Sequence, residues 1–239
     1  MTELPNLMDF HSHILPEIDD GSASVEESIE MLRIARDQGI RHMVATPHFY
    51  ANHHDPIHFL EKRKCAEELL RREMEKYSGL PQITVGAEVY FFHGMSESDL
   101  LPQLTIGEKR CMLIEMPQGH WSDEMLREVA DIWEKRDILP ILAHIDRYIT
   151  PWRAQKLIRK VSQLPVYVQA NAEFFLDRAT APLALRMLRA DQIQLLGSDC
   201  HNLRSRRPNL GEAVEVIGRK LGPDVLETVR GYECRVMEF

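Results

Sequence analysis

The 239-residue sequence lacks the features that mark membrane, secreted and nucleic-acid-binding proteins. No apolar run approaches the roughly 18 residues of a membrane span, and residues 1–9 lack the basic start and apolar stretch of a signal peptide. The 4 cysteines have no CxxC spacing, so we expect no disulfide framework. There are 29 basic and 37 acidic residues, and the resulting charge of −8 argues against binding to nucleic acid or anionic membranes. We therefore expect a cytoplasmic protein.

Short apolar runs alternate with amphipathic segments from end to end of the chain. Each run is brief and apolar throughout, which is typical of strands buried on both faces of a parallel sheet. The runs span residues 7–10, 40–46, 83–87, 111–114, 138–143, 166–170 and 193–196.

The segments between the runs carry helix signals. Ser24 and Glu27 form a Ser-x-x-Glu capping box, and Asp55 precedes Pro56 at a predicted first helical position. Seven strand–helix units indicate a closed parallel α/β barrel with a missing or distorted eighth unit. A doubly wound open sheet is the alternative, but no glycine-rich dinucleotide fingerprint supports it.

Side chains that can bind metal ions follow most of the predicted strands. Because a parallel barrel places its active site at the carboxyl ends of its strands, we expect these side chains to converge. Alternate residues of a strand share a face, so His11 and His13 can bind one ion together. The candidate ligands are His11, His13, Asp19, His48, Glu88, Glu115, His144, Asp199 and His201.

Each candidate ligand also has a purely structural interpretation. Glu88 or Glu115 could belong to an internal ion pair, and Asp199 could form a loop hydrogen bond. Their coincidence at six of the seven strand ends favours metal ions, because charges crowded together without cations are costly to desolvate. Nitrogen and carboxylate donors without thiolate fit Zn, Mn or Fe, and nine ligands suit two or three ions that share a bridging carboxylate.

Arginines near the last two ligand-bearing strand ends indicate an anionic substrate. Guanidinium groups bind phosphate oxygens bidentately, so Arg147 and Arg206 are candidate phosphate-binding residues. Arg204 and Arg207 are better explained as solvated loop residues. Cys200 lies in no Cys-x5-Arg loop, which argues against a phosphatase with a cysteine nucleophile.

The combined motifs resemble a known superfamily. They are FHSHILPEIDDG at 10–21, ATPH at 45–48, GAE at 86–88, AHIDRY at 143–148 and SDCHN at 198–202. Together they are similar to the polymerase-and-histidinol-phosphatase (PHP) superfamily, and more closely to its bacterial manganese-dependent protein-tyrosine phosphatases, which regulate capsule and exopolysaccharide synthesis. The resemblance covers residues 1–239 and implies one PHP-type catalytic domain folded as a distorted, TIM-barrel-like (β/α)7 barrel.

The resemblance also implies a trinuclear site in which Glu88 bridges two ions. By matching position, its ligands are His11, His13, Glu88 and Asp199 for the first ion, Glu88, Glu115 and His144 for the second, and Asp19, His48 and His201 for the third. Arg147 and Arg206 match the family's phosphate-contacting arginines. Manganese is the implied metal, with iron or zinc as alternatives, and the implied partner is a phosphotyrosine protein such as a bacterial tyrosine autokinase.

The sequence therefore predicts a metal-dependent phosphomonoesterase, most closely a protein-tyrosine phosphatase. In this hypothesis a metal-activated hydroxide attacks phosphorus directly, without a covalent phosphoenzyme. One alternative is a small-molecule phosphatase, such as one that acts on histidinol phosphate. Others are an amidohydrolase, which also uses an HxH pair in a barrel, and a non-catalytic module that keeps its metals as structural staples.

Overall fold

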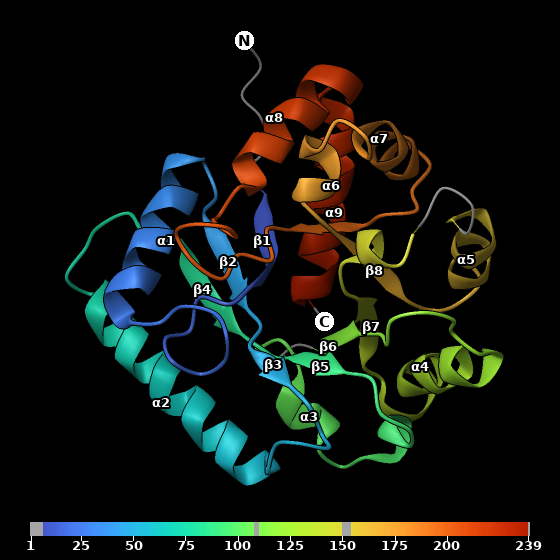
Figure 1. Ribbon diagram of the computed structural model, residues 1–239, viewed down its shortest axis with the longest axis horizontal. Coiled ribbons are helices and arrows are strands. Elements are labelled where there is room, and N and C mark those ends of the chain that lie inside the picture. Colours follow the sequence, from blue (N-terminus) through green and yellow to red (C-terminus); the bar gives the residue numbers. More distant parts are fainter. Residues whose placement is uncertain (1–6, 108–109, 150–153, 239) are drawn as a thin grey trace.

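Parallel strands form the centre of the molecule, and helices lie around them (Figure 1). The structure is a computed structural model that describes residues 7–107, 110–149 and 154–238. Every predicted apolar run coincides with a strand. These strands are β1 (Met8–Ser12), β2 (His42–Ala45), β4 (Gln82–Val85), β6 (Cys111–Glu115), β7 (Leu139–Leu142), β8 (Tyr167–Asn171) and β9 (Leu195–Gly197).

Two further strands were not expected from the sequence. The chain breaks after β2 and after β4, and each time it resumes as a short strand, β3 (His48–Phe49) or β5 (Glu88–Tyr90). The strands therefore pair in two groups, in the orders β1-β2-β4 and β3-β5-β6-β7-β8-β9. All of these pairs are parallel. These two interruptions of the strands are what distorts the barrel, because they divide its strands into two hydrogen-bonded groups.

The barrel closes where β1 meets the segment that follows β9. Ser12 forms a parallel bridge with Cys200, and the His13 N–H donates to the Cys200 carbonyl at 2.8 Å. Gly197 permits this approach, since a Cβ at that position would lie 2.6 Å from the Cβ of His11. The prediction of a distorted parallel barrel is thus confirmed, and the doubly wound sheet was the wrong alternative.

The helices begin where the capping residues predict. The Glu27 N–H donates to Ser24 Oγ at 3.2 Å, and the Ala23 N–H donates to Glu27 Oε2 at 2.8 Å, as in a capping box. Asp55 caps the next helix by accepting a 2.8 Å bond from the His58 N–H.

Helices of very different length connect the strands. The α-helices are α1 (Val25–Asp37), α2 (Pro56–Met74), α3 (Leu101–Leu104), α4 (Asp123–Arg136), α5 (Ala154–Val161), α6 (Glu173–Leu176), α7 (Ala181–Arg189), α8 (Leu210–Leu221) and α9 (Pro223–Glu238), and the 3₁₀ turns are η1 (Met95–Glu97) and η2 (Ile145–Arg147). Within the part of the chain that the structure describes, none of these helices combines the length and apolar character that a membrane span requires.

Two hydrophobic clusters divide the core. The larger cluster fills the space between strands and helices, and the smaller one joins Phe10 and Leu113 of the strands to Val236 of α9. The Met8 N–H at the start of β1 donates to Glu233 Oε1 of α9 at 3.1 Å. The α9 helix therefore packs against the amino ends of the strands and leaves their carboxyl ends available for a site.

Candidate metal centre

The candidate ligands meet at the carboxyl ends of the strands, around Glu88. The Glu88 carboxylate is almost fully buried, with 1% exposure. Its oxygens lie 3.2 Å from His11 Nε2 and 3.3 Å from His13 Nε2. They also lie 3.0 Å from His48 Nδ1 and 2.8 Å from His144 Nε2. One carboxylate thus faces four imidazoles that come from three different parts of the barrel.

The HxH pair of β1 faces a single point, as the sequence predicts. His11 Nε2 and His13 Nε2 lie 3.1 Å apart. Asp199 Oδ1 lies 3.5 Å from each of these two nitrogens. Two imidazole nitrogens and two carboxylates converging in this way form a donor set that suits Zn, Mn or Fe.

A second donor group includes Asp20, which the sequence analysis did not select. Asp20 Oδ1 lies 3.4 Å from His48 Nε2 and 3.5 Å from His201 Nε2. The expected residue, Asp19, instead accepts a 2.8 Å bond from His13 Nδ1 and a 2.9 Å bond from the His48 backbone N–H. The structure therefore places Asp20 among the donor atoms, while Asp19 holds the His13 ring in position.

A third donor group lies toward β6 and η2. Glu115, the last residue of β6, joins His48 and Glu88 in a set of donor atoms that lie within 4.8 Å of one another. Its Oε1 is 3.8 Å from His144 Nε2. Burial, together with the negative charge of Glu88, raises the pKa of Glu115. A cation between these two carboxylates would remove that repulsion.

Several buried donor atoms of the centre have no hydrogen-bond partner. They are His48 Nδ1, Glu88 Oε2, Glu115 Oε2, His144 Nδ1 and His201 Nε2. The first two lie 3.0 Å apart but are not aligned for a hydrogen bond. Buried polar atoms are otherwise almost always paired in proteins, so this concentration of unpaired atoms fits a centre that binds cations.

The electrostatics of His201 also suit a metal ligand. Burial, and then the neighbouring His13, lower the pKa of His201 to about 3. The ring is therefore neutral at physiological pH. Its Nδ1 lies 3.0 Å from the Asp199 carbonyl oxygen, and its Nε2 points toward Asp20. A neutral imidazole with a free nitrogen is the form that coordinates metal ions.

Two of the candidate ligands have a strained backbone. His144 has a φ of 31° and Asp199 has a φ of 54°, both in the left-handed region that non-glycine residues rarely adopt. Each residue lies just beyond a strand, β7 or β9, where the chain must turn the side chain into the centre. Strain of this kind persists only where surrounding contacts impose it, and it is concentrated at functional sites.

Two polar residues of β8 support three of the candidate ligands. Gln169 Oε1 accepts a 2.7 Å bond from the His144 N–H and lies 3.2 Å from His11 Nδ1. Gln169 Nε2 donates to Asn171 Oδ1 at 3.0 Å, and Asn171 Nδ2 donates to Asp199 Oδ2 at 2.9 Å. Gln169 was not among the residues predicted from the sequence, although a glutamine within an apolar strand, two residues before a polar strand end, is a detectable signal.

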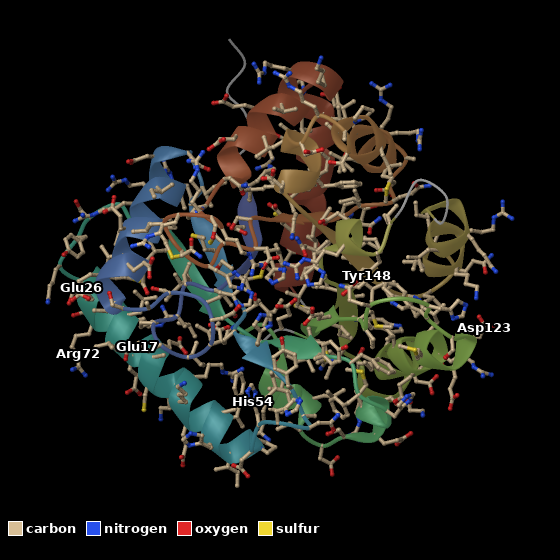
Figure 2. The ribbon with its side chains drawn as sticks, viewed as in Figure 1. Glu17, Glu26, His54, Arg72, Asp123 and Tyr148 are labelled. Carbon is tan, nitrogen blue, oxygen red and sulfur yellow. The ribbon has the colours of Figure 1, made fainter. Side chains whose placement is uncertain are left out.

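The Tyr148 ring packs against the His144 ring. The two rings lie 5.6 Å apart between centroids, and the Tyr148 hydroxyl donates to the Met116 carbonyl at 2.7 Å. In Figure 2, Tyr148 lies near the middle of the view, whereas Asp123 at the start of α4 lies at the edge.

The two predicted phosphate-binding arginines flank the centre. Arg147 Nη2 lies 2.5 Å from Asp199 Oδ2, and Arg206 Nη2 lies 2.6 Å from Asp199 Oδ1. Both side chains are about one-third exposed, at 34% and 35%, so they face solvent as well as the centre. Arg207 instead pairs with Glu212 at 2.7 Å on the surface. Arg206 therefore lies against the centre, whereas its neighbour Arg207 lies against a surface carboxylate.

The remaining reactive residues lie outside this arrangement. Cys200 is fully buried, and burial raises the pKa of its thiol well above the ordinary value, which leaves it unsuited to act as a nucleophile. Of the histidines in the segment after β3, His53 and His58 are exposed. His54 is half-buried and accepts a 3.2 Å bond from the Tyr50 N–H.

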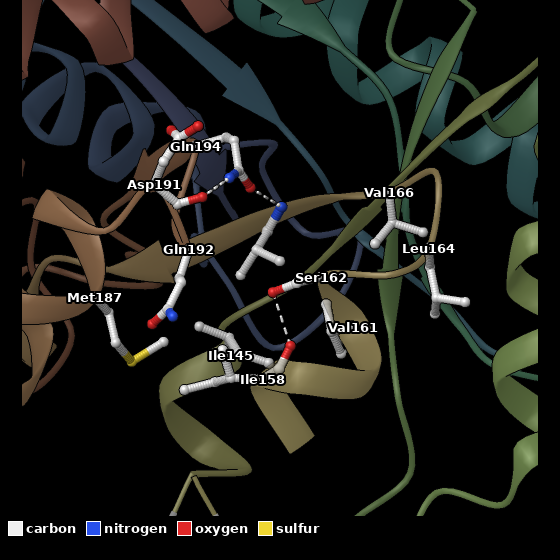
Figure 3. A pocket seen from close by; sticks show the side chains of 11 residues that line it. Ile145, Ile158, Val161, Ser162, Leu164, Val166, Met187, Asp191, Gln192 and Gln194 are labelled. Atoms are coloured by element: carbon white, nitrogen blue, oxygen red, sulfur yellow. Dashed lines mark hydrogen bonds between the residues drawn. The ribbon is translucent and has the colours of Figure 1, made fainter. Parts of the chain in front are cut away.

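A hollow lies apart from the candidate ligands. Figure 3 shows this cavity of about 130 Å³, which is lined largely by apolar side chains of α5, α7 and β8. Its polar residues are hydrogen-bonded, as in the 2.8 Å bond from Ser162 Oγ to the Ile158 carbonyl. Among the described residues, none of the candidate ligands lines it, so it is separate from the candidate metal centre.

The fold and the site define a parallel α/β barrel with a candidate polynuclear metal centre at its carboxyl edge. Residues 7–234 match the family described as "Capsular polysaccharide synthesis, CpsB/CapC". The chain belongs to this family, which confirms the resemblance inferred from the motifs.

Similar curated proteins match over nearly the whole chain. The tyrosine-protein phosphatase YwqE of Bacillus subtilis (strain 168) is 28% identical over 231 residues, which cover 92% of this chain and 87% of YwqE. The tyrosine-protein phosphatase CpsB of Streptococcus pneumoniae is 29% identical over 231 residues, covering 90% of this chain and 91% of CpsB.

Solved structures confirm the fold. A structure reported with YwqE from Bacillus subtilis and CpsB from Streptococcus pneumoniae, described as metal-dependent tyrosine phosphatases, superimposes with a TM-score of 0.84. It is 24% identical, and the match covers 97% of this chain and 94% of that one. A mutant organophosphorus hydrolase from Deinococcus radiodurans gives a TM-score of 0.54 at 13% identity, covering 96% of this chain and 92% of that one.

Proposed function

We propose that this chain is a metal-dependent phosphomonoesterase that hydrolyses phosphotyrosine in proteins and acts in the regulation of capsule or exopolysaccharide synthesis. The observation that carries the proposal is the set of buried, unpartnered donor atoms around Glu88. The names of the similar proteins, which are tyrosine-protein phosphatases, and the description of the family support the substrate and the process. On this proposal residues 1–239 act as one PHP-type catalytic domain.

The proposed ligands form three sets, and Glu88 belongs to the first and the second of them. They are His11, His13, Glu88 and Asp199 for the first ion, Glu88, Glu115 and His144 for the second, and Asp20, His48 and His201 for the third. Asp20 replaces Asp19 in the third set because its oxygen, unlike those of Asp19, lies near both His48 and His201. We propose manganese as the metal, with iron or zinc as alternatives, in two or three sites.

The residues of the chain bind and orient the substrate in this proposal. Bound ions would lower the pKa of a water molecule and neutralise negative charge on the phosphoryl group. Arg147 and Arg206 donate N–H groups to phosphoryl oxygens, and their shared contact with Asp199 holds both guanidinium groups at one side of the centre. A phenolate leaving group needs less protonation than an alkoxide, which favours phosphotyrosine as the substrate.

The proposed partner is a phosphotyrosine protein, such as a bacterial tyrosine autokinase. The direct test compares turnover of a phosphotyrosine peptide and of histidinol phosphate by manganese-loaded protein, before and after chelation. We expect higher kcat/KM for the peptide, loss of activity with chelator and loss of activity in His11→Ala. A preference for histidinol phosphate would favour the small-molecule phosphatase, and unchanged turnover in His11→Ala would refute the site assignment.

A further inference from the structure

Two tyrosines lie one step outward from the candidate ligands, Tyr90 at the end of β5 and Tyr50 just beyond β3. The register of β3 and β5 pairs His48 with Glu88, and Tyr50 and Tyr90 each follow their ligand by two residues. Alternate residues share a face, so the tyrosines lie beside the ligands, about 6.6 Å further along. The ring centroids of Tyr50 and Tyr90 are 5.5 Å apart, and the Tyr50 ring is 5.4 Å from the His48 ring.

These two rings line a hollow that opens beside the metal centre. Its volume is about 460 Å³, and its walls include the half-buried rings of Tyr50, Tyr90 and Phe92 and the exposed His53. Tyr90 is also the register partner of Glu115 in the β5–β6 pair. The hollow therefore borders the centre, because Tyr50 packs beside His48 and Tyr90 pairs with Glu115.

Contacts within the turn that follows β3 hold Tyr50 in place. The His53 and His54 N–H groups donate to the Tyr50 carbonyl at 2.9 Å. The His54 ring stacks on Phe59 of α2, with 5.9 Å between centroids and an angle of 5°. The segment rich in histidine thus holds the backbone of Tyr50 in place beside the hollow.

We propose that Tyr50 and Tyr90 form the subsite that binds the phenyl ring of a phosphotyrosine substrate; this inference rests on the proposed function. In phosphotyrosine a single oxygen atom joins the ring to phosphorus, so a phosphate held at the ligands places the ring in the next layer of side chains. Tyr50 and Tyr90 make up that layer. Aromatic rings attract one another in offset or edge-to-face arrangements, whereas phosphoserine and phosphothreonine have no ring to contribute.

Binding of two phosphonates that are not hydrolysed tests the subsite. Phenylphosphonate and methylphosphonate share a head group and differ in the ring, and calorimetry on manganese-loaded protein measures each affinity. We expect Tyr50→Leu and Tyr90→Leu each to weaken phenylphosphonate binding about 5- to 10-fold and to leave methylphosphonate binding unchanged. Tyr50→Phe, which keeps the ring, and Tyr77→Leu, at an exposed tyrosine after α2, are the matched controls and should bind as wild type.

The possible results are separable. The subsite would be overturned if the leucine variants bound both phosphonates equally more weakly, or bound both as tightly as wild type. Melting temperature and metal content verify that each variant is folded and loaded with metal. The two leucine variants are independent, so one folded variant suffices. Turnover of a phosphotyrosine peptide by the wild-type protein is measured separately and tests the proposed function. If the protein hydrolyses the peptide but binds phenylphosphonate no more tightly than methylphosphonate, only the subsite is overturned. If it binds phenylphosphonate more tightly but does not hydrolyse the peptide, only the proposed function is overturned.

Discussion

Replacing Glu233 with glutamine should stabilise the protein at alkaline pH. Glu233 of α9 is fully buried, its Oε1 accepts the Met8 N–H at 3.1 Å, and its Oε2 has no hydrogen-bond partner. Burial, with a smaller contribution from the Asp9 carboxylate, raises the pKa of Glu233 to about 8, although the hydrogen bond from Met8 and the charge of Arg230 oppose the increase. A neutral glutamine keeps the acceptor for Met8 and removes the ionisable group.

The sign of the effect follows from proton binding. The carboxyl of the unfolded chain ionises near its ordinary pKa of 4.5, and that of the folded chain ionises near 8. Between these values the folded chain binds more protons, so stability is lost as pH rises, and the loss is complete above pH 8. The slope of about 1.4 kcal/mol per pH unit flattens as pH approaches the folded-state pKa, so wild type should lose about 2 kcal/mol between pH 6 and pH 8 through Glu233 alone.

Urea unfolding of metal-free protein at pH 6, 7 and 8 measures this loss. Other groups, such as Asp9, titrate in both proteins, so the difference between the wild-type and Glu233→Gln curves isolates the effect of removing the Glu233 carboxyl. We expect the variant to gain about 2 kcal/mol over wild type from pH 6 to pH 8. Glu227→Gln, at an exposed position of the same helix that pairs with Arg230, is the control and should follow wild type. Parallel curves for wild type and Glu233→Gln would refute the reasoning.

Three further predictions concern the centre. Asp20→Asn should bind one ion fewer per chain than wild type, whereas Asp19→Asn should bind every ion with an affinity about 10- to 100-fold weaker. Equal metal content in the two variants would contradict the assignment of Asp20, rather than Asp19, as a ligand. Arg206→Ala should lower kcat/KM for a phosphotyrosine peptide about 10- to 100-fold with metal retained, while Arg207→Ala should match wild type. Asn202 Oδ1 accepts the backbone N–H groups of the loop that carries Arg206, at 2.9 to 3.3 Å, so Asn202→Ala should raise KM about 3- to 10-fold and Asn202→Asp should restore it. An unchanged KM in Asn202→Ala would show that the loop holds Arg206 without it.

The main strands could be predicted from the sequence because strands buried on both faces of a parallel sheet must be apolar throughout. The short strands β3 and β5 could not, since each is no longer than three residues and begins with a polar candidate ligand, His48 or Glu88. No pattern of apolar residues marks such a strand. The breaks before them depend on contacts with distant segments, as at Gly86, where a Cβ would lie 2.9 Å from Ile106 Cγ1.

The positions of the candidate ligands followed from barrel topology, but their individual contacts did not. Asp19 and Asp20 are adjacent in a loop, and sequence spacing alone gives no reason to prefer one of them. The loop path decides, since Gly21 packs so closely that a Cβ there would lie 2.3 Å from the His13 carbonyl oxygen. That path brings Asp19 to His13 Nδ1 and leaves Asp20 facing His201. Side-chain support from Gln169 likewise depends on the pairing of distant strands.

Metal content tests the central claim most directly. The protein is incubated with manganese, freed of unbound ions and analysed by inductively coupled plasma mass spectrometry. Because Glu88 faces four imidazoles, we predict two or three ions per wild-type chain, fewer in Glu88→Gln, and wild-type content in Glu227→Gln. Folded wild-type protein that retains no stoichiometric manganese, iron or zinc, or a Glu88→Gln variant with wild-type content, would contradict the account.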